Sequence, residues 1–214
     1  MGYCMVYRLL KSALFAFVIT GTQAQAQDVR ITAEMPAFSV SINGVAIDIS
    51  RIQDTSNRLD TEYAQTSRPC PPFCVQPVSL APGVETIGEL ELLSFLEEYV
   101  ENGTGFLVDS RTQDWFARGS IPGAVNIPNP AIEPGNPYRD EILLALGATH
   151  DGDTWNYDDA KELALFCNGP WCGQSPAAIK YLIIAGYPQE KLHYYRGGVQ
   201  MWVMLGLSLT SPNS

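Results

Sequence analysis

Four cysteines could carry chemistry in this sequence: Cys70, Cys74, Cys167 and Cys172. Cys167 directly follows a short apolar run, and eight residues later Ser175 begins a helical pattern. This spacing predicts that Cys167 ends a buried strand and that a compact strand-to-helix loop follows it. Ligands of open α/β sheets bind outside the carboxyl ends of strands, and the positive end of a helix dipole favours a thiolate. We therefore expect Cys167 to be a reactive, nucleophilic thiol.

The loop expected after Cys167 carries two glycines and a second cysteine. Gly169 and Gly173 allow the backbone to approach a substrate closely. Cys172 could attack a persulfide or disulfide on Cys167, as a resolving thiol does. It could equally be a small packing residue, or the nucleophile itself, although the strand end favours Cys167 for that role. The candidate active-site loop comprises Asn168, Gly169, Pro170, Trp171, Cys172, Gly173, Gln174 and Ser175, with Trp171 placed to wall it.

Cys70 and Cys74 form a second pair, separated by three residues rather than by the two of thioredoxin-type motifs. A local disulfide is the first interpretation, because disulfides persist in an oxidising compartment. A redox pair that exchanges with Cys167 or Cys172 is an alternative. A four-cysteine zinc site is a third, but it would consume the thiolate that the helix start is expected to expose. We therefore expect no metal site.

The first 26 residues have the pattern of a signal peptide. Arg8 and Lys11 precede an apolar run, and an A-x-A sequence at residues 24–26 fits signal-peptidase cleavage before Gln27. An amphipathic helix of a cytosolic protein is the alternative. No later stretch reaches the roughly 20 apolar residues of a membrane-spanning helix. The sequence thus predicts an exported, periplasmic protein that makes no membrane contact after cleavage.

The chain is acidic, with 13 Lys and Arg against 23 Asp and Glu, and a net charge of -10. Cleavage after residue 26 would leave 11 basic and 23 acidic residues in a mature chain of net charge -12. This charge disfavours nucleic acid and anionic membrane surfaces as partners. The remaining length is enough for one ordinary domain and a smaller appendage.

The appendage is expected at residues 27–83. It begins with two alternating runs within residues 38–49, which flank an Asn-Gly pair at 43–44, the preferred pair of a two-residue type I′ hairpin. This turn gives a register in which all six apolar side chains share one face. Because two strands alone are marginal in water, the hairpin should pack against the main domain. The polar remainder, residues 54–83, is expected to be extended and mostly irregular.

The main domain is expected at residues 84–211. Strand patterns alternate there with helical ones, which is typical of an α/β fold with a mainly parallel sheet and helices on both faces. Ser175 is expected as the N-cap of the helix after the loop, with Pro176 at its first position and Gly186 at its stop. The expected helices are about 89–100, 138–146 and 175–185, and the expected strands are 106–108, 163–166 and 192–195.

Three blocks of this region resemble the rhodanese-like sulfurtransferase family. Residues 106–128, FLVDSRTQDWFARGSIPGAVNIP, resemble its first signature, a strand ending in Asp-x-Arg and then Gly-x-Ile-Pro-Gly-Ala. Residues 165–187, LFCNGPWCGQSPAAIKYLIIAGY, resemble its strand, active cysteine, loop and helix. Residues 194–207, YYRGGVQMWVMLGL, resemble its closing Gly-Gly-x-x-x-Trp element. The three blocks occur in the order that the family has.

The resemblance implies a rhodanese-like α/β fold and sulfur transfer without a cofactor. Cys167 would accept a sulfane sulfur from a small sulfur-containing donor, thiosulfate or a persulfide, and pass it to a thiol or other nucleophilic acceptor. Asp109 and Arg111 match the family's Asp-x-Arg and are interpreted as a mainly structural pair beside the site. Ser120 stands where the family commonly has His, in what is expected to be a structural turn.

The loop departs from the family in its charge. It is longer than usual and holds no Lys or Arg between Cys167 and Ser175, whereas members that use thiosulfate often have basic loop residues. The same absence argues against the related phosphatases, whose loop needs an Arg for phosphate. Two alternatives to sulfur transfer stay open: a thiol-disulfide redox or persulfide-relay protein that uses both cysteine pairs, and a non-catalytic binding module.

Overall fold

The structure is a computed structural model. It describes residues 29–65, 68, 75, 77–152 and 154–211. The predicted signal peptide lies outside these residues, and so do Cys70 and Cys74 with the disulfide predicted for them. Across the described part of the chain, no helix is long and apolar enough to cross a membrane.

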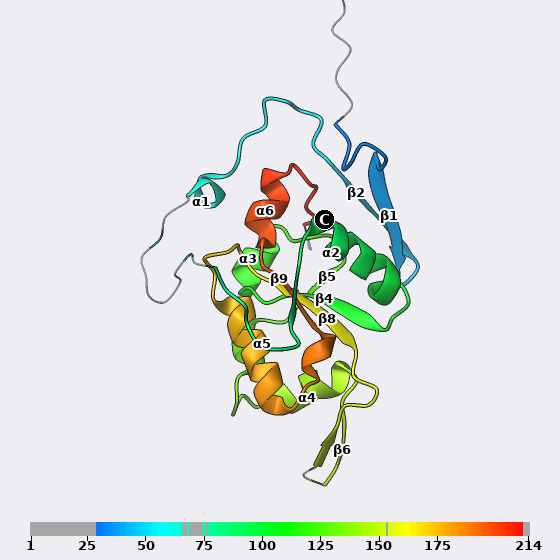
Figure 1. The fold of residues 1–214 in the computed structure, drawn as a ribbon, viewed down its shortest axis with the longest axis vertical. Coiled ribbons are helices and arrows are strands. Elements are labelled where there is room, and N and C mark those ends of the chain that lie inside the picture. The colour runs from blue at the N-terminus through cyan, green and yellow to red at the C-terminus, as the bar shows by residue number, and fades with distance from the viewer. Residues whose placement is uncertain (1–28, 66–67, 69–74, 76, 153, 212–214) are drawn as a thin grey trace, which may run out of the picture.

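Five parallel strands form the centre of the molecule (Figure 1). They are β3 (Glu85–Ile87), β4 (Gly105–Asp109), β5 (Ala124–Asn126), β8 (Glu162–Phe166) and β9 (Leu192–Tyr195). They lie in the order β3-β9-β8-β4-β5. Central strand β8 is buried over its last four residues, as a strand covered on both faces must be. The three strands predicted from the sequence are present, with bounds within one residue of those expected.

Helices cover both faces of this sheet, which confirms the predicted α/β fold. Successive side chains of β4 and β8 point to opposite faces of the sheet, so they pack alternately into two separate cores. One core holds Leu107 and Phe166, and the other holds Val108 and Leu165. The first core is completed by α2 (Glu89–Phe95), its π-helical continuation η1 (Leu96–Val100) and α6 (Gly198–Met204). The second core is completed by η2 (Asn129–Ile132), α4 (Arg139–Ala145) and α5 (Gln174–Ala185).

Short elements fill the connections. Helix α3 (Gln113–Ala117) follows β4, and η3 (Gln189–Lys191) precedes β9. An antiparallel pair, β6 (Thr149–Asp151) and β7 (Thr154–Asn156), projects from the lower end of the molecule in Figure 1. One helical turn, α1 (Thr61–Ala64), lies inside the segment for which the sequence predicts mostly irregular structure.

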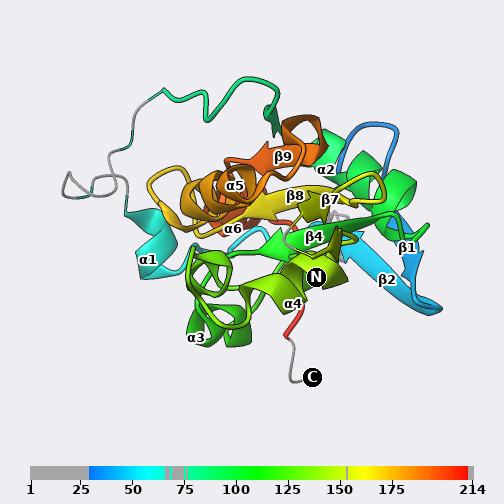
Figure 2. The ribbon, with the colours of Figure 1, turned by 90° about the horizontal axis from the view of Figure 1, so that it is seen from below.

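The N-terminal hairpin has the predicted register. Strands β1 (Ala37–Ile42) and β2 (Val45–Ser50) pair antiparallel, and both turn residues, 43 and 44, have positive φ as a type I′ turn requires. Ile49 is fully buried in the first core, whereas Val45 beside the turn stays 64% exposed and is the exception on the apolar face. Figures 1 and 2 place the hairpin on the side of the main domain that lies away from α1.

This packing predicts that the hairpin contributes to the stability of the whole domain. Ile49→Val removes one buried methyl group and should lower the free energy of unfolding by about 0.5–1.5 kcal/mol. Val45→Ala, at the exposed position, should change it by less than about 0.5 kcal/mol. Urea unfolding followed by tryptophan fluorescence checks both. Equal effects of the two substitutions would show that the hairpin does not fold together with the core.

Candidate active site

Cys167 lies where the sequence predicts it, directly after β8 at the carboxyl end of the sheet, and it is 1% exposed. The first turn of α6 holds the backbone of Cys167 and of the residue after it. Val199 N–H donates to the carbonyl oxygen of Cys167 at 3.0 Å, and Gln200 N–H donates to that of Asn168 at 2.9 Å. These two hydrogen bonds fix the start of the loop. The Cys167 sulfur therefore has a defined position relative to the N-terminal end of helix α5.

The sulfur of Cys167 is surrounded by hydrogen-bond donors. Ser175 Oγ donates to it at 3.1 Å, and the backbone N–H groups of Ser175 and Gly169 and the side chain of Cys172 also bond to it. Burial raises the pKa of this thiol, but these donors together outweigh burial and bring the pKa to about 7 from the ordinary 9.0. A large fraction of Cys167 is therefore thiolate at neutral pH, which is the form that attacks sulfur.

Ser175 does not act as the helix N-cap, contrary to the prediction. Helix α5 begins one residue earlier, at Gln174, and its N-cap is Gly173, which has no side chain to accept a bond. The Ser175 hydroxyl is fully buried and donates to the Cys167 sulfur instead of accepting from the helix backbone. Its other partner is the buried hydroxyl of Tyr194, at the end of β9. A residue expected to start a helix is thus part of the thiolate's environment.

The second cysteine is folded back toward the first by a turn. Cys172 N–H donates to the carbonyl oxygen of Gly169 at 2.9 Å, with Pro170 at the second position of the turn, where its fixed φ is suited. The Cys167 thiol donates to the carbonyl oxygen of Cys172 at 3.5 Å, and the two side chains influence each other's pKa. Both thiols are free and buried. The hydrogen bond to Cys167 raises the pKa of Cys172, and burial and the charge on Cys167 raise it further.

Asp109 and Arg111 form the expected structural pair. Both are fully buried, and two guanidinium nitrogens of Arg111 bond the Asp109 carboxylate, the closer at 2.6 Å. Ser120 Oγ donates to the same carboxylate at 2.7 Å, so the serine takes part in the pair. Arg111 also reaches the loop, because its Nη1 donates to Asn168 Oδ1 at 3.3 Å. The pair therefore connects the end of β4 to the residue after the reactive cysteine.

Residues of the N-terminal appendage cover the loop from outside. Trp171 Nε1 donates to Gln200 Oε1 at 3.0 Å, and Gln200 Nε2 donates to the carbonyl oxygen of Tyr63 at 2.6 Å. The Tyr63 hydroxyl accepts from Arg111 Nη1 at 3.3 Å. The guanidinium of Arg68 lies 3.4 Å from the centre of the Trp171 ring. The appendage thus forms an outer wall and brings a positive charge to a loop that has none of its own.

The structure brings most of the predicted site together. Of loop residues 168–175, Gly169, Cys172 and Ser175 interact with the Cys167 sulfur, and the Trp171 side chain bonds Gln200. Among the described residues, no group of three or more His, Cys, Asp or Glu side chains is placed to hold a metal ion. The sequence interpretation did not single out Tyr194, Gly198 or Gln200, although all three lie in the closing YYRGGVQ block, and it had no signal for the residues that the appendage contributes, Tyr63 and Arg68.

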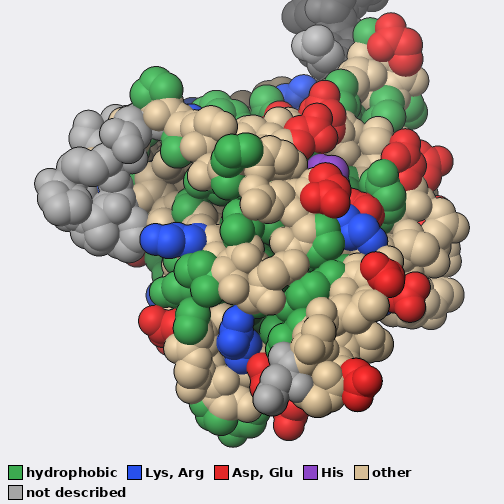
Figure 3. Space-filling view, turned by 60° about the horizontal axis from the view of Figure 1, so that its bottom comes forward, with side chains coloured by type: hydrophobic (Ala, Val, Ile, Leu, Met, Phe, Trp, Pro, Cys, Tyr) green, Lys and Arg blue, Asp and Glu red, His purple; other side chains and the backbone are tan. Residues whose placement is uncertain are grey.

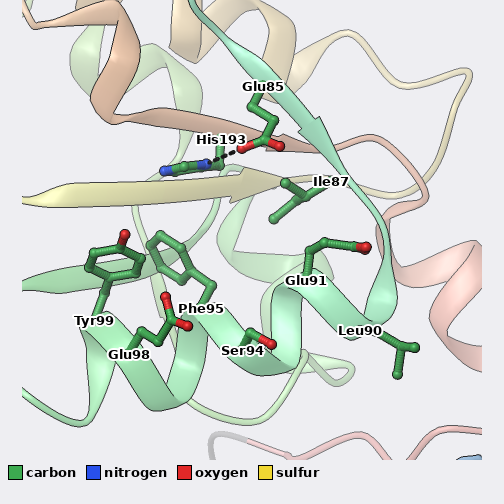
Figure 4. A pocket seen from close by; sticks show the side chains of 9 residues that line it. All are labelled: Glu85, Ile87, Leu90, Glu91, Ser94, Phe95, Glu98, Tyr99 and His193. Atoms are coloured by element: carbon green, nitrogen blue, oxygen red, sulfur yellow. Dashed lines mark ion pairs between the residues drawn. The ribbon is translucent and has the colours of Figure 1, made fainter.

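A hollow of about 300 Å³ lies apart from this site, between β3 and α2 (Figure 4). Carboxylates line it, among them Glu85, Glu91 and Glu98, and Glu85 Oε2 lies 3.5 Å from Nδ1 of His193. Acidic side chains also outnumber basic ones on the face in Figure 3, mostly along one flank. The lining residues all lie outside loop 167–175, so the hollow is separate from the cysteine chemistry.

Removal of the Ser175 hydroxyl should slow the reaction of Cys167 with electrophiles. Ser175→Ala deletes a donor that favours the thiolate, so the pKa of Cys167 should rise from about 7 toward 9.0, and less thiolate should be present at pH 7. The pH profile of iodoacetamide labelling, read on the Cys167 peptide, checks this. Ser110→Ala is the matched control, because that buried hydroxyl has no hydrogen-bond partner among the described residues. Coinciding profiles for all three proteins would contradict the assignment.

The comparisons with known proteins show what this chain is similar to. The sequence model of the family described as Rhodanese-like domain matches residues 92–205, which is 114 of the 214 residues. A rhodanese-related protein from Thermoplasma volcanium is 21% identical, with a TM-score of 0.40 over 59% of this chain and 97% of that chain. A human single domain sulfurtransferase is 23% identical, with a TM-score of 0.39 over 56% and 96%. A rhodanese-like domain protein from Staphylococcus aureus is 24% identical, with a TM-score of 0.40 over 60% and 100%. No curated protein matches the chain.

Proposed function

Because the chain belongs to the rhodanese-like domain family, we propose that it is a sulfurtransferase that acts through a persulfide on Cys167. The observation that carries the proposal is the environment of this sulfur, which accepts hydrogen bonds from the Ser175 hydroxyl and from the backbone N–H groups of Gly169 and Ser175. Such donors stabilise negative charge on sulfur without a metal or cofactor. The environment therefore suits a cysteine that is a thiolate before the reaction and carries an anionic sulfur after it.

The reaction begins when the Cys167 thiolate attacks the sulfane sulfur of the donor. A new S–S bond forms between the two sulfurs, the bond from the sulfane sulfur to the rest of the donor breaks, and that remainder leaves with the electron pair. With thiosulfate the leaving group is sulfite, and with an organic persulfide it is a thiolate. An acceptor thiolate then attacks the outer sulfur of the persulfide and returns Cys167 to the thiolate.

A persulfide is the donor that this loop favours over thiosulfate. Thiosulfate carries two negative charges, and loop 168–174 offers neutral donors and no Lys or Arg. The appendage adds one positive charge beside the loop, Arg68, which stacks on Trp171. We further propose that the protein acts in the periplasm after cleavage before Gln27, which N-terminal sequencing of protein from a periplasmic fraction would test.

Intact-protein mass spectrometry tests the function. Reduced mature protein is incubated with a small organic persulfide or with thiosulfate, and the mass is read before any acceptor is added. Wild-type protein should gain the mass of one sulfur atom, or should release sulfide if the persulfide breaks down, and Cys167→Ala should do neither. Cys172→Ala should still gain the sulfur, which assigns the nucleophile.

The two alternative functions give different results in the same experiment. A thiol-disulfide redox protein should gain no sulfur from the donor but should lose two hydrogens in a mild oxidant. A binding module should do neither of these. Either result, obtained with folded wild-type protein, would overturn the assignment as a sulfurtransferase.

A further inference from the structure

We propose that Cys172 resolves the persulfide on Cys167, so that the protein reduces a sulfane sulfur to sulfide and is left with a Cys167–Cys172 disulfide. This inference rests on the proposed function, because it needs the persulfide as its starting point. It adds an internal acceptor, a product and a requirement for a reductant to that function.

The first support is the position of the second thiol. The turn closed by the Gly169 carbonyl and the Cys172 N–H returns the chain toward β8, and the Cys167 thiol donates to the carbonyl oxygen of Cys172 at 3.5 Å. Both are free thiols, and the Cys172 sulfur has one further polar contact, to Gln174 Oε1 at 3.3 Å. A nucleophile held in the same buried loop as the atom that it attacks has a large advantage over one that must diffuse in.

The second support is the burial of the pair. Cys167 is 1% exposed and Cys172 is 6% exposed. Trp171 lies on the outside of the loop and is bonded through Gln200 to the backbone of Tyr63. An external thiol on a protein or a bulky metabolite must displace this wall before it reaches a persulfide on Cys167. Cys172 lies inside the wall, so the internal thiol is the acceptor that meets no steric barrier.

The third support is that persulfide formation itself should activate Cys172. In the resting protein, the hydrogen bond to Cys167 and the charge on Cys167 are two of the three causes that hold the pKa of Cys172 high, together with burial. Once Cys167 carries a persulfide, its own sulfur is neutral and the charge lies on the outer sulfur. Two of the causes are then weakened, so Cys172 gives up its proton more readily when there is a persulfide to attack.

The step is balanced without any further reactant. The Cys172 sulfur attacks the Cys167 sulfur and forms the disulfide bond, and the bond between Cys167 and the outer sulfur breaks. The outer sulfur takes the electron pair of that bond and the proton from Cys172, and it leaves as HS⁻. The two cysteines are oxidised and the sulfane sulfur is reduced. A dithiol reductant, such as a thioredoxin-like protein or dithiothreitol, must reduce the disulfide before the next turnover.

A single-turnover experiment under anaerobic conditions tests the inference. One equivalent of organic persulfide is added to reduced full-length protein, and mass, released sulfide and the disulfide map are followed together. In wild-type protein, the gain of one sulfur should be transient, and one sulfide should be released for each Cys167–Cys172 disulfide formed. Cys172→Ser keeps a hydrogen-bond donor beside Cys167 but cannot form a disulfide. It should hold its persulfide at least about tenfold longer than wild type and should release no sulfide.

The controls separate this inference from the function on which it rests. The double variant Cys70→Ser, Cys74→Ser should behave as wild type, because neither cysteine takes part. A wild-type persulfide as long-lived as that of Cys172→Ser, with no disulfide, would overturn the resolving role and leave the sulfurtransferase intact. A Cys167–Cys172 disulfide formed without an equivalent of sulfide would also overturn it. No sulfur gain and no sulfide release from either protein would overturn the proposed function, and the inference with it.

Discussion

Gly198→Ala is expected to abolish sulfur loading on Cys167 and to lower the free energy of unfolding by about 2–4 kcal/mol, from overpacking together with the left-handed backbone. Gly198 has a φ of +56°, which L side chains rarely adopt. A Cβ at this position would overlap the carbonyl oxygen of Cys167 and lie 2.7 Å from the backbone nitrogen of Gly169. These are backbone atoms, which cannot rotate away as a side chain can. The start of the loop must therefore move, and the donors around the sulfur move with it.

The matched control for this substitution is Gly135→Ala. Gly135 also has a positive φ, +89°, but a Cβ added there would meet no atom within 4 Å beyond its chain neighbours, so it isolates the backbone cost of about 1 kcal/mol. Urea unfolding gives the stability of both variants, and the rate of iodoacetamide labelling of Cys167 gives the state of the loop. Gly135→Ala should label as wild type does. If Gly198→Ala also labels at the wild-type rate, the contact between α6 and the loop does not position the sulfur.

The parts of the fold that the sequence predicted correctly are those with a local cause. The hairpin register follows from the two turn residues and the alternation on either side of them, and all of this lies within residues 38–49. The place of Cys167 follows from the apolar run before it and the helical pattern after it. In both cases the deciding interactions join residues close in sequence, so periodicity and turn chemistry were enough.

The helix start shows where a local rule failed for a tertiary reason. Ser175 has the residue type and the following Pro176 that are typical of an N-cap. In the fold, the Cys167 sulfur lies beside it and accepts the hydrogen bond of its hydroxyl. Gly173 then serves as the cap, and the helix begins one residue before Ser175. The sequence predicts that the Ser175 hydroxyl accepts a hydrogen bond from the helix backbone, whereas in the fold it donates one to the Cys167 sulfur.

The part of the outer wall that the appendage contributes had no sequence signal. Gln200 bonds the backbone of Tyr63 across 137 positions of the chain, and Arg68 stacks on Trp171 from the same appendage. No spacing rule pairs a glutamine, a tyrosine and an arginine that lie so far apart in the sequence. Their association depends on where the appendage crosses the carboxyl end of the sheet, and only the folded chain determines that.

Loss of the Arg111 side chain is expected to have the largest effect on stability. Arg111→Met removes the guanidinium that bonds the buried Asp109 carboxylate at 2.6 Å and leaves that carboxylate with Ser120 as its main side-chain partner. A buried charge without its partner should lower the free energy of unfolding by about 3–5 kcal/mol, a large fraction of the stability of an ordinary domain. The midpoint of urea unfolding should fall with the slope unchanged, because the surface exposed on unfolding stays the same.

Two further variants show whether the unpaired charge is the cause. Adding Asp109→Asn to Arg111→Met removes the charge and should recover part of the lost stability, although each substitution disrupts the pair. Arg118→Met, at an exposed arginine on the same connection whose guanidinium lies 4.6 Å from the centre of the Trp115 ring, should change stability by less than about 1 kcal/mol. A double variant less stable than Arg111→Met would show that the unpaired carboxylate is not the cause of the loss. The contacts of Arg111 with Asn168 and the Gly119 carbonyl would then be the alternative cause. The loss would then reflect the anchoring of the active loop, and Cys167 labelling would change in proportion to it.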